Sequence, residues 1–207
     1  MSQELIKQIN ELRKSKIKLE VDNRLNEFKE LNNSEDWFSE LCYCLLTANS
    51  KAETALNIEK ELKGKGFHSY SQSEIKRCIR RNKHRFHNNK SKFIVEARKF
   101  KDIKNIIREK DQIEARTWLV DNIKGIGYKE ASHFLRNVGY NNVAILDRHI
   151  INLMVEHNMI KEKPNILNKN NYPEIEKKLE KLANSINMSQ AELDLYLWSL
   201  KTGKVLK

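Results

Sequence analysis

Apolar residues recur at spacings of three and four along almost the whole chain, and this pattern constrains the fold more than any other feature. Such spacing places apolar side chains on one face of an α-helix. Only 6 glycines and 2 prolines interrupt the 207 residues, and the strict alternation of apolar and polar residues that marks a strand is hard to find. The chain is therefore predicted to be all-α, either as one compact unit or as two small lobes that share a cleft.

Caps and glycines divide the helical pattern into segments. Ser34 is expected to cap a helix that starts near Trp37, Ser71 or Ser73 a short helix, and Ser189 the last helix. The glycines of residues 64–66 predict a helix stop and a turn. The other expected helices cover residues 5–17, 21–31, 51–63, 93–100, 113–120, 129–138, 147–155, 173–186 and 189–201, with loops at 82–89, 139–142 and 164–171.

The charge balance favours a polyanionic partner. Lys and Arg number 39 against 28 Asp and Glu, which gives a net charge of +11 and makes nucleic acid the expected ligand. An acidic membrane surface would also fit this charge, but no amphipathic anchor or long apolar run supports it. A composition rich in Asn, Lys and Ile can also follow from an AT-rich genome, so the charge alone does not decide between these explanations.

The cysteines predict free thiols. Cys42, Cys44 and Cys78 form an odd set without the spacing of a metal site or a disulfide framework, so no metal is expected. The amphipathic, charged residues 1–16 resemble neither a signal peptide nor a membrane span. We therefore expect a cytoplasmic protein without contact to a membrane.

The most informative segment is residues 123–129 (IKGIGYK), between two expected helices. Gly125 and Gly127 allow a sharp turn and a close approach of the backbone to a ligand. The following helix offers its first N–H groups and the positive end of its dipole, which together can seat a phosphate. A Gly-x-Gly pattern by itself is more often a plain turn between helices.

This segment resembles the helix-hairpin-helix signature of the DNA glycosylase superfamily, which is usually Leu-Pro-Gly-Val-Gly with a Lys two residues later. Lys124 stands where proline is commoner, which removes some rigidity and adds a positive charge. The resemblance implies that Gly125, Gly127 and Lys124 contact a DNA phosphate. It also implies a structural monovalent cation on the carbonyl groups of the hairpin, and no other cofactor.

The resemblance implies that Lys129 is a nucleophile, because its position separates members with lyase activity from those without. A neutral amine can attack the anomeric carbon of a nucleotide, expel the base and leave a Schiff base, which permits strand cleavage by β-elimination. Asp147, 18 residues later, resembles the Asp of the family's Val-Asp-x-His element and would stabilise the cationic sugar. An Asp before an apolar helix is also a good N-cap, and both roles can hold. His149 is expected to pack or hydrogen-bond near the DNA rather than act as a base.

Two upstream segments resemble further elements of the superfamily. Residues 45–52 (LLTANSKA) are similar to its Leu-Leu-Ser-x-Gln/Asn element, so Asn49 would fill the gap left by a flipped nucleotide. Asn49 taken alone is more typical of a helix C-terminus. Residues 86–92 (FHNNKSK) are similar to the Tyr/Phe-x-x-Lys-Ala loop, so Phe86 would stack on or beside a base, unless it is a buried anchor of the loop.

Departures from the pattern narrow the resemblance. The chain has no cysteine after Cys78, whereas relatives of endonuclease III carry four C-terminal cysteines for an iron–sulphur cluster. Its N-terminal residues are expected to be helical, unlike the β-rich N-terminal domain of eukaryotic-type 8-oxoguanine glycosylases. Residues 35–207 resemble the archaeal type 2 8-oxoguanine DNA glycosylase/lyase, which implies a base pocket at the C-terminal helix. Asp194, Trp198 and Lys207 would recognise the base there; the alternatives are a frayed terminus and a core tryptophan.

The resemblance predicts two helical lobes, residues 32–142 and residues 1–31 plus 143–207, with Lys129 and Asp147 facing each other across an interlobe cleft. The expected function is that of a monomeric, bifunctional glycosylase and AP lyase that excises 8-oxoguanine from duplex DNA after the damaged nucleotide flips out. Two alternatives stay open. The chain could act on oxidised pyrimidines by the same chemistry, or it could be a non-catalytic helix-hairpin-helix module that only binds DNA.

Overall fold

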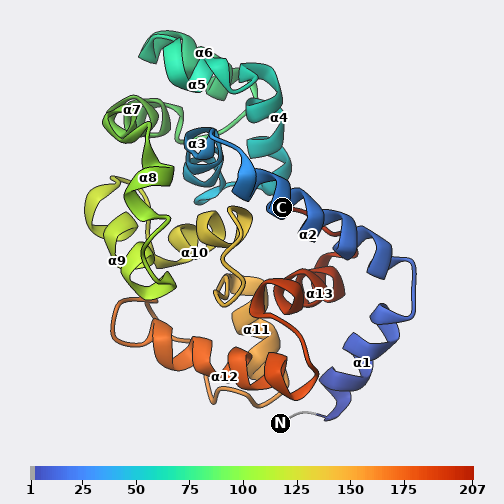
Figure 1. The fold of residues 1–207 in the computed structure, drawn as a ribbon. Coiled ribbons are helices and arrows are strands. Elements are labelled where there is room, and N and C mark those ends of the chain that lie inside the picture. Colours follow the sequence, from blue (N-terminus) through green and yellow to red (C-terminus); the bar gives the residue numbers. More distant parts are fainter. Residues whose placement is uncertain (1–2) are drawn as a thin grey trace. The chain divides into compact units, whose positions relative to one another are not determined.

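The computed structural model describes residues 3–207, and over that range every regular element is a helix (Figure 1). The prediction of an all-α chain is confirmed, because apolar spacing and scarce glycine leave no stretch that favours a strand. The helices in chain order are α1 (Gln3–Arg13), α2 (Ile17–Asn33), α3 (Trp37–Thr47), α4 (Ala52–Leu62), α5 (Lys65–Ser69), α6 (Gln72–Arg81), α7 (His87–Ala97), the 3₁₀ helix η1 (Arg98–Phe100), α8 (Ile103–Ile107), α9 (Gln112–Asn122), α10 (Tyr128–Asn137), α11 (Arg148–Glu156), α12 (Tyr172–Ser185) and α13 (Gln190–Thr202).

The chain forms two compact units, residues 31–134 and residues 1–30 together with 135–207. The division falls within α2 and α10, whereas the sequence placed the second boundary after residue 142. Residues 141 and 142 belong with the C-terminal helices because their carbonyl groups accept hydrogen bonds from the start of α13. The Asn141 carbonyl accepts from the Ala191 amide at 3.0 Å, and the Asn142 carbonyl from the Gln190 side chain at 3.0 Å.

Helix α3 is the centre of the unit formed by residues 31–134. Ten of its eleven residues are buried, because its sequence is apolar on every side rather than on one stripe. Helices α4, α5, α7 and α8 pack against it. The indole N–H of Trp37, the first residue of α3, donates to the Leu31 carbonyl at 3.0 Å and ties the helix to the end of α2.

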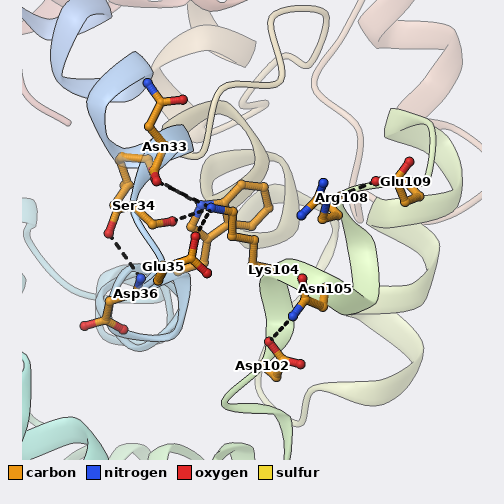
Figure 2. A network of polar contacts seen from close by, with 11 residues as sticks. Asn33, Ser34, Glu35, Asp36, Asp102, Lys104, Asn105, Arg108 and Glu109 are labelled. Atoms are coloured by element: carbon orange, nitrogen blue, oxygen red, sulfur yellow. Dashed lines mark hydrogen bonds and ion pairs between the residues drawn. The ribbon is translucent and has the colours of Figure 1, made fainter.

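The joint between α2 and α3 corrects the predicted cap. The N-cap of α3 is Asp36, whose carboxylate accepts the Ser39 amide at 3.0 Å, and not Ser34. Ser34 lies two residues too early, and its hydroxyl instead accepts the Asp36 amide at 3.1 Å. Figure 2 shows how Lys104 of α8 completes this joint, donating to the Ser34 carbonyl at 2.9 Å and to the Glu35 carboxylate at 2.8 Å.

Helix α13 has the same central place in the other unit. Helices α1, α11 and α12 pack against it, and most of its residues are buried. Helix α12 supports the segment that leads into α11. The Tyr172 hydroxyl donates to the Ala144 carbonyl at 2.7 Å and accepts the Leu146 amide at 3.1 Å, and the Glu176 carboxylate accepts the Ala144 amide at 2.9 Å. These contacts hold the backbone that ends at Asp147.

Other local predictions have mixed outcomes. The caps at Ser71 and Ser189 are confirmed, and Ser71 forms a full capping box with Glu74. The predicted loop at 82–89 is too long, because α7 begins at His87. The predicted turn at 64–66 is in part the short helix α5, and the helix predicted over residues 5–17 ends at Arg13.

Candidate active site

The turn between α9 and α10 has the hairpin geometry that its glycines predict. The Ile126 amide donates to the Ile123 carbonyl at 3.2 Å and closes the turn. Gly125 lies at φ +91, and a Cβ there would come within 2.4 Å of the Phe93 ring. Two features of this position therefore favour glycine: its left-handed backbone conformation and the close approach of the Phe93 ring. Lys124 is exposed, and its Nζ atom lies 5.8 Å from the centroid of the same ring.

Gly127 has a different role in the hairpin. Its amide donates to Oε2 of Glu130 at 3.3 Å, and a Cβ on Gly127 would lie 3.3 Å from the same oxygen. A larger residue at position 127 would therefore meet the flexible Glu130 side chain, whereas one at position 125 would meet the Phe93 ring. A DNA phosphate that used the Gly127 amide would have to compete with Glu130 for it.

Lys129 lies in the first turn of α10, directly after the hairpin. Its side chain is 26% exposed, and its Nζ atom is 3.7 Å from Oε1 of Glu130. The amine is thus partly buried and still reachable, next to one carboxylate. The sequence analysis missed Glu130, although an acidic residue in the first turn of a helix is a known stabilising feature.

Lys90 of α7 is a second lysine near Lys129 that the sequence did not assign to a role. It is only 5% exposed, and burial lowers the pKa of its side chain from the usual 10.5 to about 8, while Glu130 raises it and Lys129 lowers it further. The spacing of Lys90 with the buried Ile94 and Ala97 is that of one helix face. That spacing was the signal that could have predicted a buried lysine.

One imidazole joins the two upstream segments that were predicted to touch DNA. His84 is buried; its Nδ1 accepts the Phe86 amide at 3.2 Å and its Nε2 donates to the Leu46 carbonyl at 3.0 Å. These two contacts require the neutral tautomer with the proton on Nε2. Burial lowers the pKa of His84, which keeps the ring neutral. The sequence did not single out His84.

His84 thereby brings the Asn49 and Phe86 segments together within one unit. Asn49 is exposed at φ 59, just beyond the end of α3. Phe86 is half-buried, with the Arg85 guanidinium 4.5 Å from its ring centroid. Both side chains are accessible, as a contact with DNA requires, and their roles stay predictions.

Asp147 is the N-cap of α11, as its position before an apolar helix predicted. One carboxylate oxygen, Oδ1, accepts the His149 amide at 2.8 Å and the Ile150 amide at 2.9 Å. Among the contacts of residues 3–207, the other oxygen accepts no hydrogen bond from the protein. The cap therefore holds the carboxylate in place while one oxygen stays available to a ligand.

Asp194 is buried in an ion pair with Arg136. Burial raises the pKa of Asp194 to about 6, and the Arg136 cation opposes this rise; the carboxylate also has a hydrogen bond to the backbone of Ile145. Arg136 in turn donates to Oδ1 of Asn137 at 2.8 and 3.0 Å. The carboxylate that was predicted to recognise the base thus has internal partners, and base recognition by Asp194 stays a prediction.

Trp198 and His149 form an edge-to-face pair with ring centroids 5.1 Å apart. The indole Nε1 of Trp198 is buried and has no hydrogen-bond partner among residues 3–207. A buried N–H group without a partner is uncommon and costs stability. The indole N–H of Trp198 is therefore available to donate a hydrogen bond to a ligand. Lys207, at the end of the chain, is partly exposed.

The residues of 3–207 contain no cluster of three or more His, Cys, Asp or Glu side chains that could hold a metal ion. A monovalent cation at the hairpin would depend on main-chain carbonyl groups instead, and it stays a prediction. Cys42, Cys44 and Cys78 are buried and form no disulfide. No helix of the described chain has the length and apolar character of a membrane span.

Comparisons with known proteins find relatives along almost the whole chain. The family model described as 8-oxoguanine DNA glycosylase matches residues 21–188. The 8-oxoguanine DNA glycosylase/AP lyase of Methanocaldococcus jannaschii is 50% identical over 206 residues, which cover 98% of this chain and 99% of that protein. The protein of the same description from Korarchaeum cryptofilum is 42% identical, over 99% of this chain and 98% of its own length.

Solved structures give the same result. The M. jannaschii 8-oxoguanine glycosylase/lyase in complex with 15mer DNA containing 8-oxoguanine superposes with a TM-score of 0.94 at 48% identity, covering 98% of this chain and 99% of that one. The 8-oxoguanine DNA glycosylase of Thermotoga maritima has a TM-score of 0.93 at 42% identity, with 99% of each chain covered. With a family match over most of its length and full-length relatives at this identity, the chain belongs to the 8-oxoguanine DNA glycosylase family.

Proposed function

We propose that this protein excises 8-oxoguanine from duplex DNA and then cleaves the strand at the resulting abasic site. The observation that carries the proposal is the place of Lys129. Its partly exposed amine follows the glycine hairpin directly, in a chain that belongs to the 8-oxoguanine DNA glycosylase family. Relatives that span the whole chain are described as glycosylase/AP lyases, which supports both activities.

In the proposed reaction the neutral amine of Lys129 attacks C1′ of the flipped nucleotide. The C1′–N9 bond breaks, and its electron pair leaves with the base, which takes up a proton. The secondary ammonium formed by the attack loses a proton. The C1′–O4′ bond then breaks, O4′ takes up a proton, and the nitrogen lone pair forms the C1′=N bond of the Schiff base. Abstraction of a C2′ proton then expels the 3′ phosphate. The free oxygen of Asp147 would stabilise positive charge on the sugar as the base departs.

The hairpin and the two upstream segments would hold the DNA. We propose that Gly125, Gly127 and Lys124 seat a phosphate, because helix N-termini and an exposed cation both favour one. Asn49 would fill the space left by the flipped nucleotide, and Phe86 would stack beside it. The substrate is thus double-stranded DNA, bound by a monomer in the cytoplasm, where cysteines outside disulfides, such as those of this chain, stay reduced.

The base itself would be recognised by Asp194, Trp198 and Lys207. The unpartnered indole N–H of Trp198 supports this proposal, because a base edge offers the acceptor that it lacks. The edge-to-face contact with His149 would keep the indole in place.

Borohydride trapping tests the function directly, because only an enzyme that forms a Schiff base becomes covalently linked to damaged DNA. Wild-type protein is expected to be trapped on an 8-oxoguanine duplex, and Lys129→Gln to bind the same duplex without forming the adduct. Lys101→Gln, which removes an exposed lysine in the same unit, is the control and should be trapped normally.

The same assay separates the alternatives. Adducts on duplexes with oxidised pyrimidines but not with 8-oxoguanine would assign a different substrate. If wild-type protein binds lesion DNA but never forms the adduct, the chain is a DNA-binding module without catalytic activity.

A further inference from the structure

Two buried or half-buried charges of opposite sign flank Lys129, and the reaction described above uses neither. Glu130 is the first. Its side chain is 16% exposed, Oε2 accepts the Gly127 amide at 3.3 Å, and Oε1 lies 3.7 Å from the Lys129 amine. One carboxylate therefore connects the backbone of the hairpin with the nucleophile, and its negative charge favours the ammonium form of Lys129.

Lys90 is the second charge. It belongs to α7, where Ile94 and Ala97 are buried with it, and its charge interacts with both Glu130 and Lys129. Among residues 3–207 the Lys90 ammonium has no ion pair or side-chain hydrogen bond. Burial of an ammonium group without a direct partner is costly, so a purely structural position would favour an apolar residue.

Other charged groups lie farther along the chain or point elsewhere. His84, in the segment before α7, interacts with Lys90, His87 and Arg85, but its ring is held neutral between two backbone groups. Lys124 of the hairpin directs its amine toward the Phe93 ring. Within this unit, Glu130 on the same helix and Lys90 from α7 are thus two charges that act on Lys129.

We propose that Glu130 and Lys90 are positioning residues that together set the protonation of the Lys129 nucleophile. Glu130 holds the amine at the hairpin and stabilises its ammonium form, and the cation of Lys90 opposes this by favouring the neutral amine that attacks the sugar. A lysine next to another cation is a recognised way to obtain a neutral amine near neutral pH. The inference rests on the proposed function, because it assigns a role in activating Lys129.

The test is the pH dependence of single-turnover borohydride trapping on the 8-oxoguanine duplex. Glu130→Gln should move the pH midpoint of trapping to lower pH, and Lys90→Gln should move it to higher pH, each by about one unit. Lys90→Arg keeps the cation and should retain a midpoint close to that of wild type. Opposite shifts distinguish an electrostatic role from a structural one, which would lower the trapping rate at every pH without moving the midpoint.

Matched controls remove the same charges at exposed positions of the same unit. Lys101→Gln and Glu114→Gln should leave the midpoint unchanged. Shifts of both test variants in the same direction, or lower rates with an unchanged midpoint, would overturn the inference. Circular dichroism shows whether Lys90→Gln folds. If it does not fold, the inference is judged by the other two variants: the midpoint of Glu130→Gln must move to lower pH, and that of Lys90→Arg must stay close to that of wild type.

A titration that needs no activity separates this inference from the proposed function. Lysines are dimethylated with a ¹³C label, the Lys129 signal is assigned by its loss in Lys129→Arg, and its titration midpoint is followed by NMR in the free protein. Glu130→Gln and Lys90→Gln should displace this midpoint in opposite directions. If the midpoints move in this way while wild-type protein is never trapped on damaged DNA, the proposed function is wrong and the effect of Glu130 and Lys90 on Lys129 is supported. If trapping occurs but the NMR midpoints do not move, only the inference about Glu130 and Lys90 is wrong.

Discussion

Gly125 and Phe93 are in direct contact: a Cβ on Gly125 would lie 2.4 Å from Cδ2 of the Phe93 ring, at a backbone φ of +91. Both features penalise any side chain at this position. Gly125→Ala is therefore expected to destabilise the protein by at least about 2 kcal/mol and to weaken DNA binding, because the hairpin must shift. Urea unfolding and fluorescence anisotropy with duplex DNA measure the two effects.

Gly127→Ala is the matched comparison. It meets only the flexible Glu130 side chain, at 3.3 Å, so its cost in unfolding free energy should stay below about 1 kcal/mol. Equal losses in the two variants would show that the Phe93 contact does not govern the hairpin.

Asp147 combines a cap and a proposed catalytic charge, and two substitutions separate them. Asp147→Asn keeps an oxygen for the His149 and Ile150 amides, so its stability should remain within about 0.5 kcal/mol of wild type. Asp147→Ala loses the cap and should cost about 1 kcal/mol. Both should reduce the rate of trapping by about 10²–10³-fold, because both remove the negative charge. Trapping at the wild-type rate by Asp147→Asn would leave Asp147 with the capping role alone.

The buried pair of Asp194 and Arg136 predicts a large effect on stability. Asp194→Leu leaves the guanidinium group buried without its carboxylate, and such a change costs about 3–5 kcal/mol. Asp194→Asn keeps an acceptor for Arg136 and should cost less. Thermal unfolding ranks the variants, and a smaller loss for Leu than for Asn would contradict this account. The excision rate of the folded Asn variant tests base recognition separately.

Lys90 makes stability depend on pH. Burial lowers its pKa from 10.5 to about 8, so between these values the unfolded chain binds more protons than the folded protein. Stability therefore rises with pH across this window, and at pH 7 the buried ammonium destabilises the fold. Lys90→Met should be more stable than wild type at pH 7 by on the order of 2–3 kcal/mol.

The difference between Lys90→Met and wild type should shrink as the pH rises from 8 to 10.5. Urea unfolding at a series of pH values measures it, with Lys101→Met as the exposed control. A difference that does not change with pH would show that packing of the methionine, rather than the charge of Lys90, accounts for the gain.

Features that depend on neighbours in the chain were predictable. The helical class followed from apolar spacing, and the caps at Ser71, Asp147 and Ser189 followed from residue types just before apolar runs. The hairpin followed from its glycines, which lie between the end of α9 and the start of α10. Each of these contacts spans four residues or fewer, so the sequence contains both partners side by side.

The cap of α3 shows where local reasoning failed. Ser34 and Asp36 are both good N-cap residues, and nothing nearby decides between them. Lys104, about 70 residues later, binds the Ser34 carbonyl and the Glu35 carboxylate and so places the turn before Asp36 (Figure 2).

The sequence by itself determined most of the helices, the hairpin and the cap at Asp147, because periodicity and capping act over one or two helical turns. Only the tertiary structure decided that Lys90 is buried near Lys129, that His84 joins the Leu46 and Phe86 backbones, and that Asp194 is paired with Arg136. These facts depend on burial and on partners about 40 to 60 residues apart. Burial changes the cost of a charge far more than any neighbour in the sequence does, and it exists only once the helices have packed.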